Sequence, residues 1–253
     1  MSLFVTPPPT RYDLQFTLFG IPVRVHPLFW LMALIFGASL RNFFDILIWV
    51  VVVFISILAH EVGHALALRR FGQHSQIVLH LAGGLTMPEA EYWGGRSVST
   101  SRTSTQEIIV SLAGPLTGFL LAAFVIAVVV AIGGTITMTA LFGIIPFPVA
   151  YLPAGSQILN SIILTFLWVN IFWGVINLMP VYPLDGGNIT RYLLLKMDPW
   201  DGVRNSLWVS VIAGGIVAVA GLFLMGSIYV ALLFGYLSFL SYQMLGGLSR
   251  RGY

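Results

Sequence analysis

Residues 46–68 read ILIWVVVVFISILAHEVGHALAL, a nearly continuous apolar run with two histidines and one glutamate near its end. A helix that crosses a lipid bilayer needs about 20 apolar residues, so this stretch is long enough to span one. At about 1.5 Å per residue, Glu61 lies about 22 Å from a helix start near Ile46. We therefore predict a transmembrane helix that carries ionisable side chains at membrane depth, nearer to its C-terminal end.

The rest of the chain shares this apolar character. Of its 253 residues, 58% are hydrophobic and only 8% are charged, against about 25% in an ordinary soluble domain. No charged residue occurs from Ile108 to Leu184 or from Asn205 to Ser249. So few charges could not cover the surface of a water-soluble protein, which excludes that class. The absence of cysteine excludes disulfides and thiolate metal ligands.

The apolar runs predict the fold class, an all-α polytopic membrane protein with about six transmembrane helices. The predicted spans are about 27–40, 46–68, 108–131, 158–179, 206–225 and 228–246. If the N-terminus is cytoplasmic, eleven of the twelve Lys and Arg residues fall on the cytoplasmic side, as the positive-inside rule requires. We therefore expect a multi-pass protein of a bacterial or archaeal cell membrane, with both termini and the site described below toward the cytoplasm.

Two connecting segments have predicted structure of their own. After the second span, residues 77–81 and 85–87 are β-prone and are separated by the pair Gly83-Gly84. This pattern favours a short β-hairpin lying against the membrane. Ser104 and Glu107 fit a capping box at the start of the third span. The uncharged segment 133–157 contains three prolines, so we expect no regular helix there.

The pattern His60-Glu61-Val62-Gly63-His64 has the spacing of a metal site. Residues four apart lie on one face of a helix, so His60 and His64 can direct their imidazoles to one ion. Glu61 can reach a water on that ion and act as a general base, and two histidines with one carboxylate leave a position open for catalysis. The alternative is a chance pairing, but it would place three ionisable groups in hydrocarbon without a purpose.

A third ligand is predicted at Asp185, in the segment NLMPVYPLDGG of residues 177–187. The two prolines of this segment should end the fourth span, and the two glycines after Asp185 let the backbone turn closely around its carboxylate. In the six-span topology Asp185 lies on the same side of the membrane as His60 and His64. The alternative role for Asp185 is to cap the following helix.

These motifs resemble those of the site-2 protease family of intramembrane zinc metalloproteases, in a compact form. The resemblance is carried by HEVGHA at 60–65 and NLMPVYPLDGG at 177–187, with support from FGIPVRVHP at 19–27, AGGLTMP at 82–88 and LAGPL at 112–116. It implies a Zn2+ ion bound by His60, His64 and Asp185, with Glu61 activating water for peptide-bond hydrolysis. It also implies that the substrate is itself a membrane-spanning protein.

The resemblance carries further expectations about organisation. Residues 1–253 would form a single membrane-embedded domain, with a catalytic core at about 43–190 and peripheral helices at about 27–40 and 206–246. Asn177, Gly83 and Gly84 are expected to position the substrate, although Asn177 could equally serve polar packing. One departure is Gly118, where the family often has asparagine.

The expected partners are the lipid bilayer and a membrane-spanning protein substrate. Nucleic acid is not expected, because the basic residues do not gather in a groove or stripe; an oligomer is possible. The alternative function is a non-catalytic membrane protein that binds or transports metal, for which polar residues strung across the bilayer would be expected. A cleavage-dead homologue is a further alternative, and the intact Glu61 counts against it. The sequence does not identify the substrate.

Overall fold

The structure is a computed structural model that describes residues 7–40, 42–88, 102–141 and 145–249. These residues form two compact units, and each is described here by itself. The first unit comprises Met1–Thr100, Leu116–Thr139 and Pro148–Gly174, and the second comprises Ser101–Pro115, Ala140–Phe147 and Val175–Tyr253.

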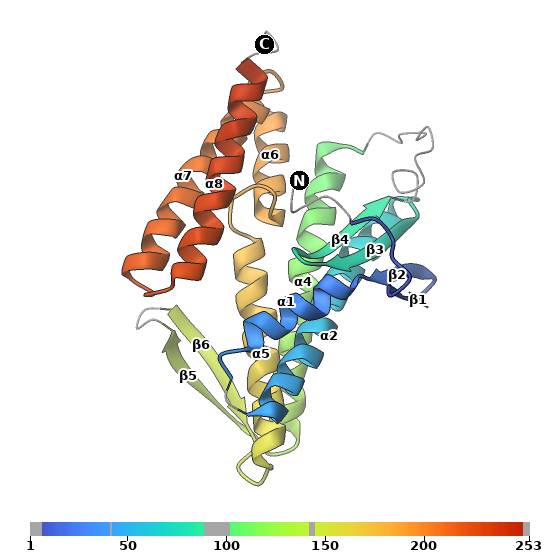
Figure 1. Cartoon of the computed structure of the whole chain (residues 1–253), viewed down its shortest axis with the longest axis vertical. Helices are drawn as coiled ribbons and strands as arrows, with labels where there is room; N and C mark the ends of the chain where they lie inside the picture. The colour runs from blue at the N-terminus through green and yellow to red at the C-terminus, as the bar shows by residue number, and fades with distance from the viewer. Residues whose placement is uncertain (1–6, 41, 89–101, 142–144, 250–253) are drawn as a thin grey trace. The chain divides into compact units, whose positions relative to one another are not determined.

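The elements follow one another along the chain as Figure 1 labels them. The helices are α1 (Pro27–Gly37), α2 (Phe43–Arg70), α4 (Ser104–Ala131), α5 (Gln157–Asn177), α6 (Asp185–Met197), α7 (Gly202–Phe223) and α8 (Ile228–Ser249). The strands are β1 (Leu14–Leu18), β2 (Ile21–Val25), β3 (Ser75–His80), β4 (Gly83–Pro88), β5 (Thr135–Leu141) and β6 (Ile145–Tyr151).

Five described helices are long and apolar enough to cross a membrane, namely α2, α4, α5, α7 and α8. The protein is therefore an integral multi-pass membrane protein, as predicted. The remaining predicted span, at about 27–40, corresponds to α1, which has only 11 residues. At 1.5 Å per residue α1 covers about 16 Å, about half of the hydrocarbon core. It cannot begin earlier, because β2 ends two residues before it.

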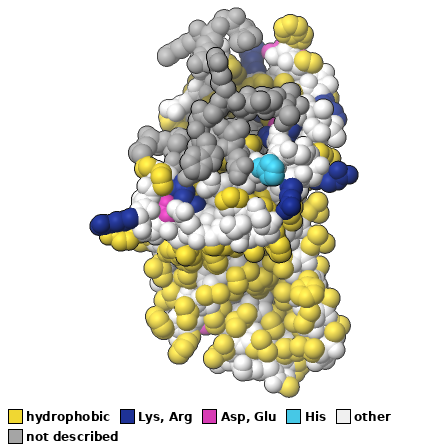
Figure 2. All heavy atoms as spheres, turned by 90° about the vertical axis from the view of Figure 1, so that its right-hand side faces the viewer, with side chains coloured by type: hydrophobic (Ala, Val, Ile, Leu, Met, Phe, Trp, Pro, Cys, Tyr) yellow, Lys and Arg dark blue, Asp and Glu magenta, His cyan; other side chains and the backbone are white. Residues whose placement is uncertain are grey.

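The hydrophobic surface follows from these helices. Figure 2 shows hydrophobic side chains over a broad and nearly continuous area, with Lys and Arg side chains gathered to one side of it. Leu34 of α1 and Val51 of α2 are examples of the exposed aliphatic side chains on these helices. This separation of apolar and basic surfaces is what a bilayer and its interface require.

The predicted hairpin after α2 is confirmed as β3 and β4, and it belongs to a larger sheet. The strand order is β1-β2-β3-β4, with β1 antiparallel to β2 and β3 antiparallel to β4. The central pair, β2 and β3, is parallel, with Val23 opposite Ile77. The sequence analysis did not predict β1 and β2. The expectation of an all-α protein therefore holds for the candidate spans and not for the segments that connect them.

The parallel pairing of β2 and β3 constrains the path of the chain. Strand β2 leads directly into α1, and β3 follows directly after α2. Because the two strands are neighbours in one sheet, the chain leaves the sheet along α1 and returns to it along α2. The segment before α1 and the segment after α2 thus meet in one sheet beyond the C-terminal end of α2.

The sheet and the first two helices share one apolar core. Val25, Phe29, Ala33 and Ile77 are fully buried in it, and Phe29 makes edge contacts with neighbouring aromatic rings. This core fixes the sheet against the C-terminal half of α2.

Arg24, one of the eleven basic residues that the sequence analysis assigned to the cytoplasmic side, also has a structural role. It lies on β2, is buried, and pairs with Asp13 at 3.0 Å. Burial alone would raise the pKa of Asp13, but hydrogen bonds from Thr10 and Arg24 outweigh it and lower that pKa. The pair attaches the segment before β1 to the sheet.

The second unit contains α6, α7 and α8. Helices α7 and α8 run side by side as an antiparallel hairpin (Figure 1). They approach closely where Gly214 lies against Ser238 and Gly221 lies against Val230. Small residues at such crossings let helix backbones come together in a membrane.

Two local predictions can be compared with the described backbone. In the segment after α4, the described residues 135–141 and 145–151 form the two-stranded sheet β5-β6 and not a helix, as predicted. The capping box of α4 lies one residue earlier than predicted: Thr103 accepts from the Gln106 amide, and the Gln106 side chain accepts from the Thr103 amide. Glu107 accepts a hydrogen bond from Arg102 instead.

The sheet should make the protein sensitive to acid through His80. Burial, with repulsion from His26 and Arg24, lowers the pKa of His80 from 6.5 to about 4. Between these pH values the unfolded chain binds a proton that the folded chain excludes, so stability should fall as pH falls from 6.5 to 4. His80→Asn keeps an acceptor for the Ala82 amide. In detergent, the melting temperature of this variant should depend less on pH between 4 and 6.5 than that of wild type. An equal acid dependence in both proteins would contradict the assignment.

Candidate functional site

Helix α2 brings the two histidines of the HExxH pattern together as the spacing predicts. The Nε2 atoms of His60 and His64 lie 3.1 Å apart, and their rings are nearly perpendicular. Both side chains are buried, as is Glu61. The apolar helix around them supplies the low-dielectric surroundings in which a bound cation and its ligands attract each other strongly.

The spacing of the two nitrogens suits a shared metal ion. Two bonds of about 2.05 Å from a tetrahedral zinc would place the imidazole nitrogens about 3.3 Å apart. The observed separation is close to this value. The residues of α2 therefore fit a zinc ion, with His60 and His64 as two of its ligands.

Strand β4 lies directly against Glu61. A methyl group at Gly84 would collide with the Cγ and Oε1 atoms of Glu61, so only glycine allows this approach. Two residues further on, the Thr86 hydroxyl lies 2.6 Å from Oε2 of Glu61 and 3.1 Å from its carbonyl oxygen. Residues 84 and 86 share one face of the strand, and that face touches the glutamate.

Gly83 has a different role from its neighbour. Its φ angle is +113°, a region that side-chain-bearing residues rarely adopt, and it follows the tight turn between β3 and β4. The position of a Cβ on Gly83 lies 3.6 Å from the Trp173 ring of α5. Gly83 thus shapes the turn, and Gly84 makes room for Glu61.

Asp185 is the first residue of α6 in the second unit, and it is half-buried. The residue at the N-cap position is Leu184, so the alternative that Asp185 serves as the N-cap does not fit this helix start. Side chains at Gly186 or Gly187 would collide with the backbone of residues 178–182. The two glycines therefore let the first turn of α6 pack on the preceding loop.

Asn177 is the last residue of α5 and is buried. The helix ends there, three residues before Pro180, as the prolines of this segment predict. The structure thus brings together His60, Glu61, His64 and Gly84 in the first unit. Asn177 and Asp185 belong to the second unit.

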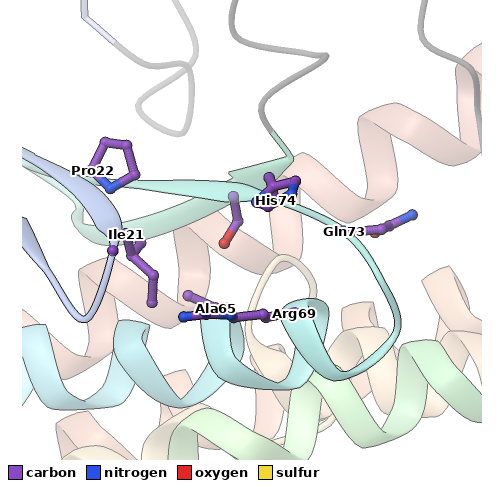
Figure 3. A pocket seen from close by; sticks show the side chains of 8 residues that line it. Ile21, Pro22, Ala65, Arg69, Gln73 and His74 are labelled. Atoms are coloured by element: carbon purple, nitrogen blue, oxygen red, sulfur yellow. The ribbon is translucent and has the colours of Figure 1, made fainter.

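A small cavity lies beyond the C-terminal end of this cluster. It has a volume of about 70 Å³ and lies among β2, the end of α2 and the start of β3, where Ala65, Arg69 and His74 line it (Figure 3). Pockets for small molecules measure roughly 300–1,000 Å³. This cavity is too small for a peptide, and none of its lining residues belongs to the HExxH pattern.

Sequence reasoning missed Thr86. The signal was its position two residues after Gly84, on the same face of a strand that already contained two predicted site residues. Recognising it required knowing that this face, and not the opposite one, meets α2.

The fold and the spacing of the site can now be compared with known proteins. The family described as Peptidase family M50 matches residues 48–219, which include most of α2, all of β4 and all of α6. The chain belongs to this family. The resemblance to site-2 proteases drawn from the motifs is confirmed.

Relatives of this M50 chain include two named zinc metalloproteases. It is 31% identical over 195 residues to "Putative zinc metalloprotease sll0528" of Synechocystis sp., covering 72% of this chain and 44% of the relative. It is 27% identical over 185 residues to "Zinc metalloprotease MJ0392" of Methanocaldococcus jannaschii, covering 72% of this chain and 45% of the relative. The M50 chain thus spans less than half the length of these relatives.

A solved structure shares the fold of this M50 chain. It is the "Site-2 Protease from Methanocaldococcus jannaschii", with a TM-score of 0.54 and 23% sequence identity. The match covers 92% of this chain and 95% of the other. The likeness therefore extends over nearly the whole chain.

The contact between Gly84 and Glu61 predicts a steric cost for any side chain at residue 84. Gly84→Ala should destabilise this M50 chain by about 1–3 kcal/mol, because a methyl group there overlaps Glu61. Gly215→Ala on α7 is the matched control, since a methyl group there meets nothing within 4 Å and should be neutral or slightly stabilising. Thermal unfolding in detergent measures both. A Gly84→Ala protein as stable as the control would show that the contact is absent.

Proposed function

We propose that this protein is an intramembrane zinc metalloprotease that hydrolyses a peptide bond within or near a transmembrane segment of a membrane-protein substrate. The observation that carries the proposal is the convergence of His60 and His64, beside Glu61, inside an apolar helix of an M50 chain. Ionisable side chains are costly at membrane depth and mark functional sites there.

His60, His64 and Asp185 are the proposed zinc ligands. The donor set of two imidazoles and one carboxylate is one that catalytic zinc uses, and it leaves a fourth position for water or substrate. The relatives named as zinc metalloproteases support the choice of metal. Asp185 is the only acidic residue between Glu107 and Asp198.

The proposed mechanism assigns proton transfer to Glu61. Bound zinc would polarise the scissile carbonyl and acidify a water molecule. Glu61 takes a proton from the water while the oxygen of that water bonds to the carbonyl carbon. Glu61 then delivers the proton to the amine nitrogen as the C–N bond breaks. Gly84 and Thr86 of β4 contact the side chain of Glu61 and so restrict the positions open to its carboxylate.

The substrate is proposed to bind in an extended form along β4. A transmembrane helix has its peptide groups hydrogen-bonded within itself, so hydrolysis requires local unwinding. Strand β4 is an edge of the four-stranded sheet and lies against the general base. An unwound segment that adds to this edge would recover backbone hydrogen bonds close to Glu61. Gly83, Gly84 and Asn177 are the proposed substrate-positioning residues.

A transport function fits the polar residues less well. The buried polar side chains of α2 are Ser56, His60, Glu61 and His64, which lie from the middle of the helix toward its C-terminal end. A transit route would need polar groups along the whole span. Such clustering suits a site that opens to one side, and the distribution of basic residues supports the proposal that this is the cytoplasmic side.

Substitution of the base should separate metal binding from catalysis. Glu61→Gln should keep zinc bound, because it changes no proposed ligand, and should lower hydrolysis by about 100-fold or more. Zinc measured by elemental analysis, with mass spectrometry of the peptides released in membranes that carry each protein, checks both results. Asp45→Asn, in the first turn of the same helix, is the charge-matched control and should keep both zinc and activity. Equal peptide release by wild type and Glu61→Gln would contradict the proposed mechanism.

Substitution of the third ligand should instead remove the metal. Asp185→Ala should weaken zinc binding by more than about 100-fold, the upper end of what loss of an outer-sphere partner costs. Asp201→Asn, an exposed acid on the same unit, is the control and should retain zinc. Competition with a chelator measures the affinity of each protein. Full zinc affinity in Asp185→Ala would exclude Asp185 as a ligand.

A further inference from the structure

The hydroxyl of Thr86 has a short contact to the carboxylate of Glu61. Its single proton has two acceptors on that residue, Oε2 at 2.6 Å and the carbonyl oxygen at 3.1 Å. A hydroxyl donating to a carboxylate forms a hydrogen bond of about 2.5–2.7 Å, roughly twice as strong as a neutral one. The shorter contact is therefore the hydrogen bond, and it occupies Oε2.

The donor is held by a rigid strand. Thr86 stands opposite Ile77 of β3, and Ile77 is fully buried in the core that β2, β3, α1 and α2 share. Glu61 lies within the long helix α2. The hydrogen bond thus joins two elements that are each fixed by packing, which is what positioning a catalytic group requires.

The other side of the carboxylate is bounded as well. A methyl group on Gly84 would collide with Cγ and Oε1 of Glu61, so the backbone of β4 passes close to that oxygen. With Oε2 held by Thr86 and Gly84 close to the carboxylate, Oε1 is the oxygen that the hydroxyl does not use.

We propose that Thr86 is the positioning residue of the Glu61 general base: its hydroxyl holds Oε2 and leaves Oε1 as the oxygen that accepts and returns the proton. This inference rests on the proposed function. The Thr86 proton stays on its own oxygen throughout. The proton of the attacking water moves to Oε1 and then to the leaving amine nitrogen, so atoms and charge balance in the step.

A positioning role predicts a loss in kcat alone. Thr86→Val keeps the branched shape and removes the hydroxyl. It should lower kcat by about 10–100-fold, in the range for a misplaced catalytic group, with KM, zinc content and melting temperature near those of wild type. Thr86→Ser restores a hydroxyl and should recover kcat to within a few-fold. Thr17→Val, on the exposed strand β1, is the control and should match wild type.

The experiment uses the full chain in detergent, with fluorescein-labelled casein as an extended polypeptide probe. Glu61→Gln is assayed in parallel. Equal cleavage of casein by Glu61→Gln and by wild type would contradict the proposed function itself, and not only the role of Thr86. The inference about Thr86 is overturned if Thr86→Val keeps kcat within two-fold while Glu61→Gln is inactive. It is also overturned if Thr86→Ser is as impaired as Thr86→Val, or if the loss follows zinc content or melting temperature.

A second readout does not depend on turnover. With 13C-labelled glutamate, the infrared difference between wild type and Glu61→Gln isolates the Glu61 carboxylate. Loss of a hydrogen bond to that carboxylate should move its antisymmetric stretch to higher frequency in Thr86→Val, and Thr86→Ser should restore the wild-type position. An unchanged band in Thr86→Val would show that the hydroxyl does not bind Glu61.

Discussion

The cost of placing ionisable side chains in hydrocarbon is the constraint on which this structure depends. Nearly all of the chain avoids it, with long uncharged runs that form all of α5 and α8 and most of α4 and α7. Helix α2 accepts the cost in one segment, where His60, Glu61 and His64 are buried together. The sheet matters because its edge strand provides polar and backbone contacts to that segment, through Thr86 and Gly84. Without Thr86 the carboxylate of Glu61 would lose this hydrogen bond in a buried position, where a charge without hydrogen bonds is costly.

The membrane part of the fold was predictable because its physics is local. Apolar length, charge distribution and the i, i+4 spacing depend on short stretches of sequence, and they correctly gave the long helices and the pairing of His60 with His64. The hairpin after α2 was predictable for the same reason, from its Gly-Gly turn. The family follows from the two motifs, and the match over residues 48–219 confirms it.

What the sequence did not reveal depends on pairings between distant segments. Strands β1 and β2 lie about fifty residues before β3, and only the assembled sheet shows that Val23 stands opposite Ile77. For the same reason α1 was expected to be a longer span: the boundary set by β2 is not visible in hydropathy. Arg24 was interpreted as a topology signal because a buried partner such as Asp13 cannot be inferred from composition. The role of Asp185 and Asn177 as site residues stays a prediction.

The position of β4 at the sheet edge has a consequence for selectivity. An open edge can pair with any extended chain, including another copy of itself, which is a known route to aggregation. Strand β4 limits this hazard by being six residues long and by ending at Pro88, which has no amide hydrogen to continue a ladder. A chain that docks there gains hydrogen bonds over a window of only about 20 Å. On the proposed function, such a window would select segments by their ability to unfold more than by the identity of their side chains.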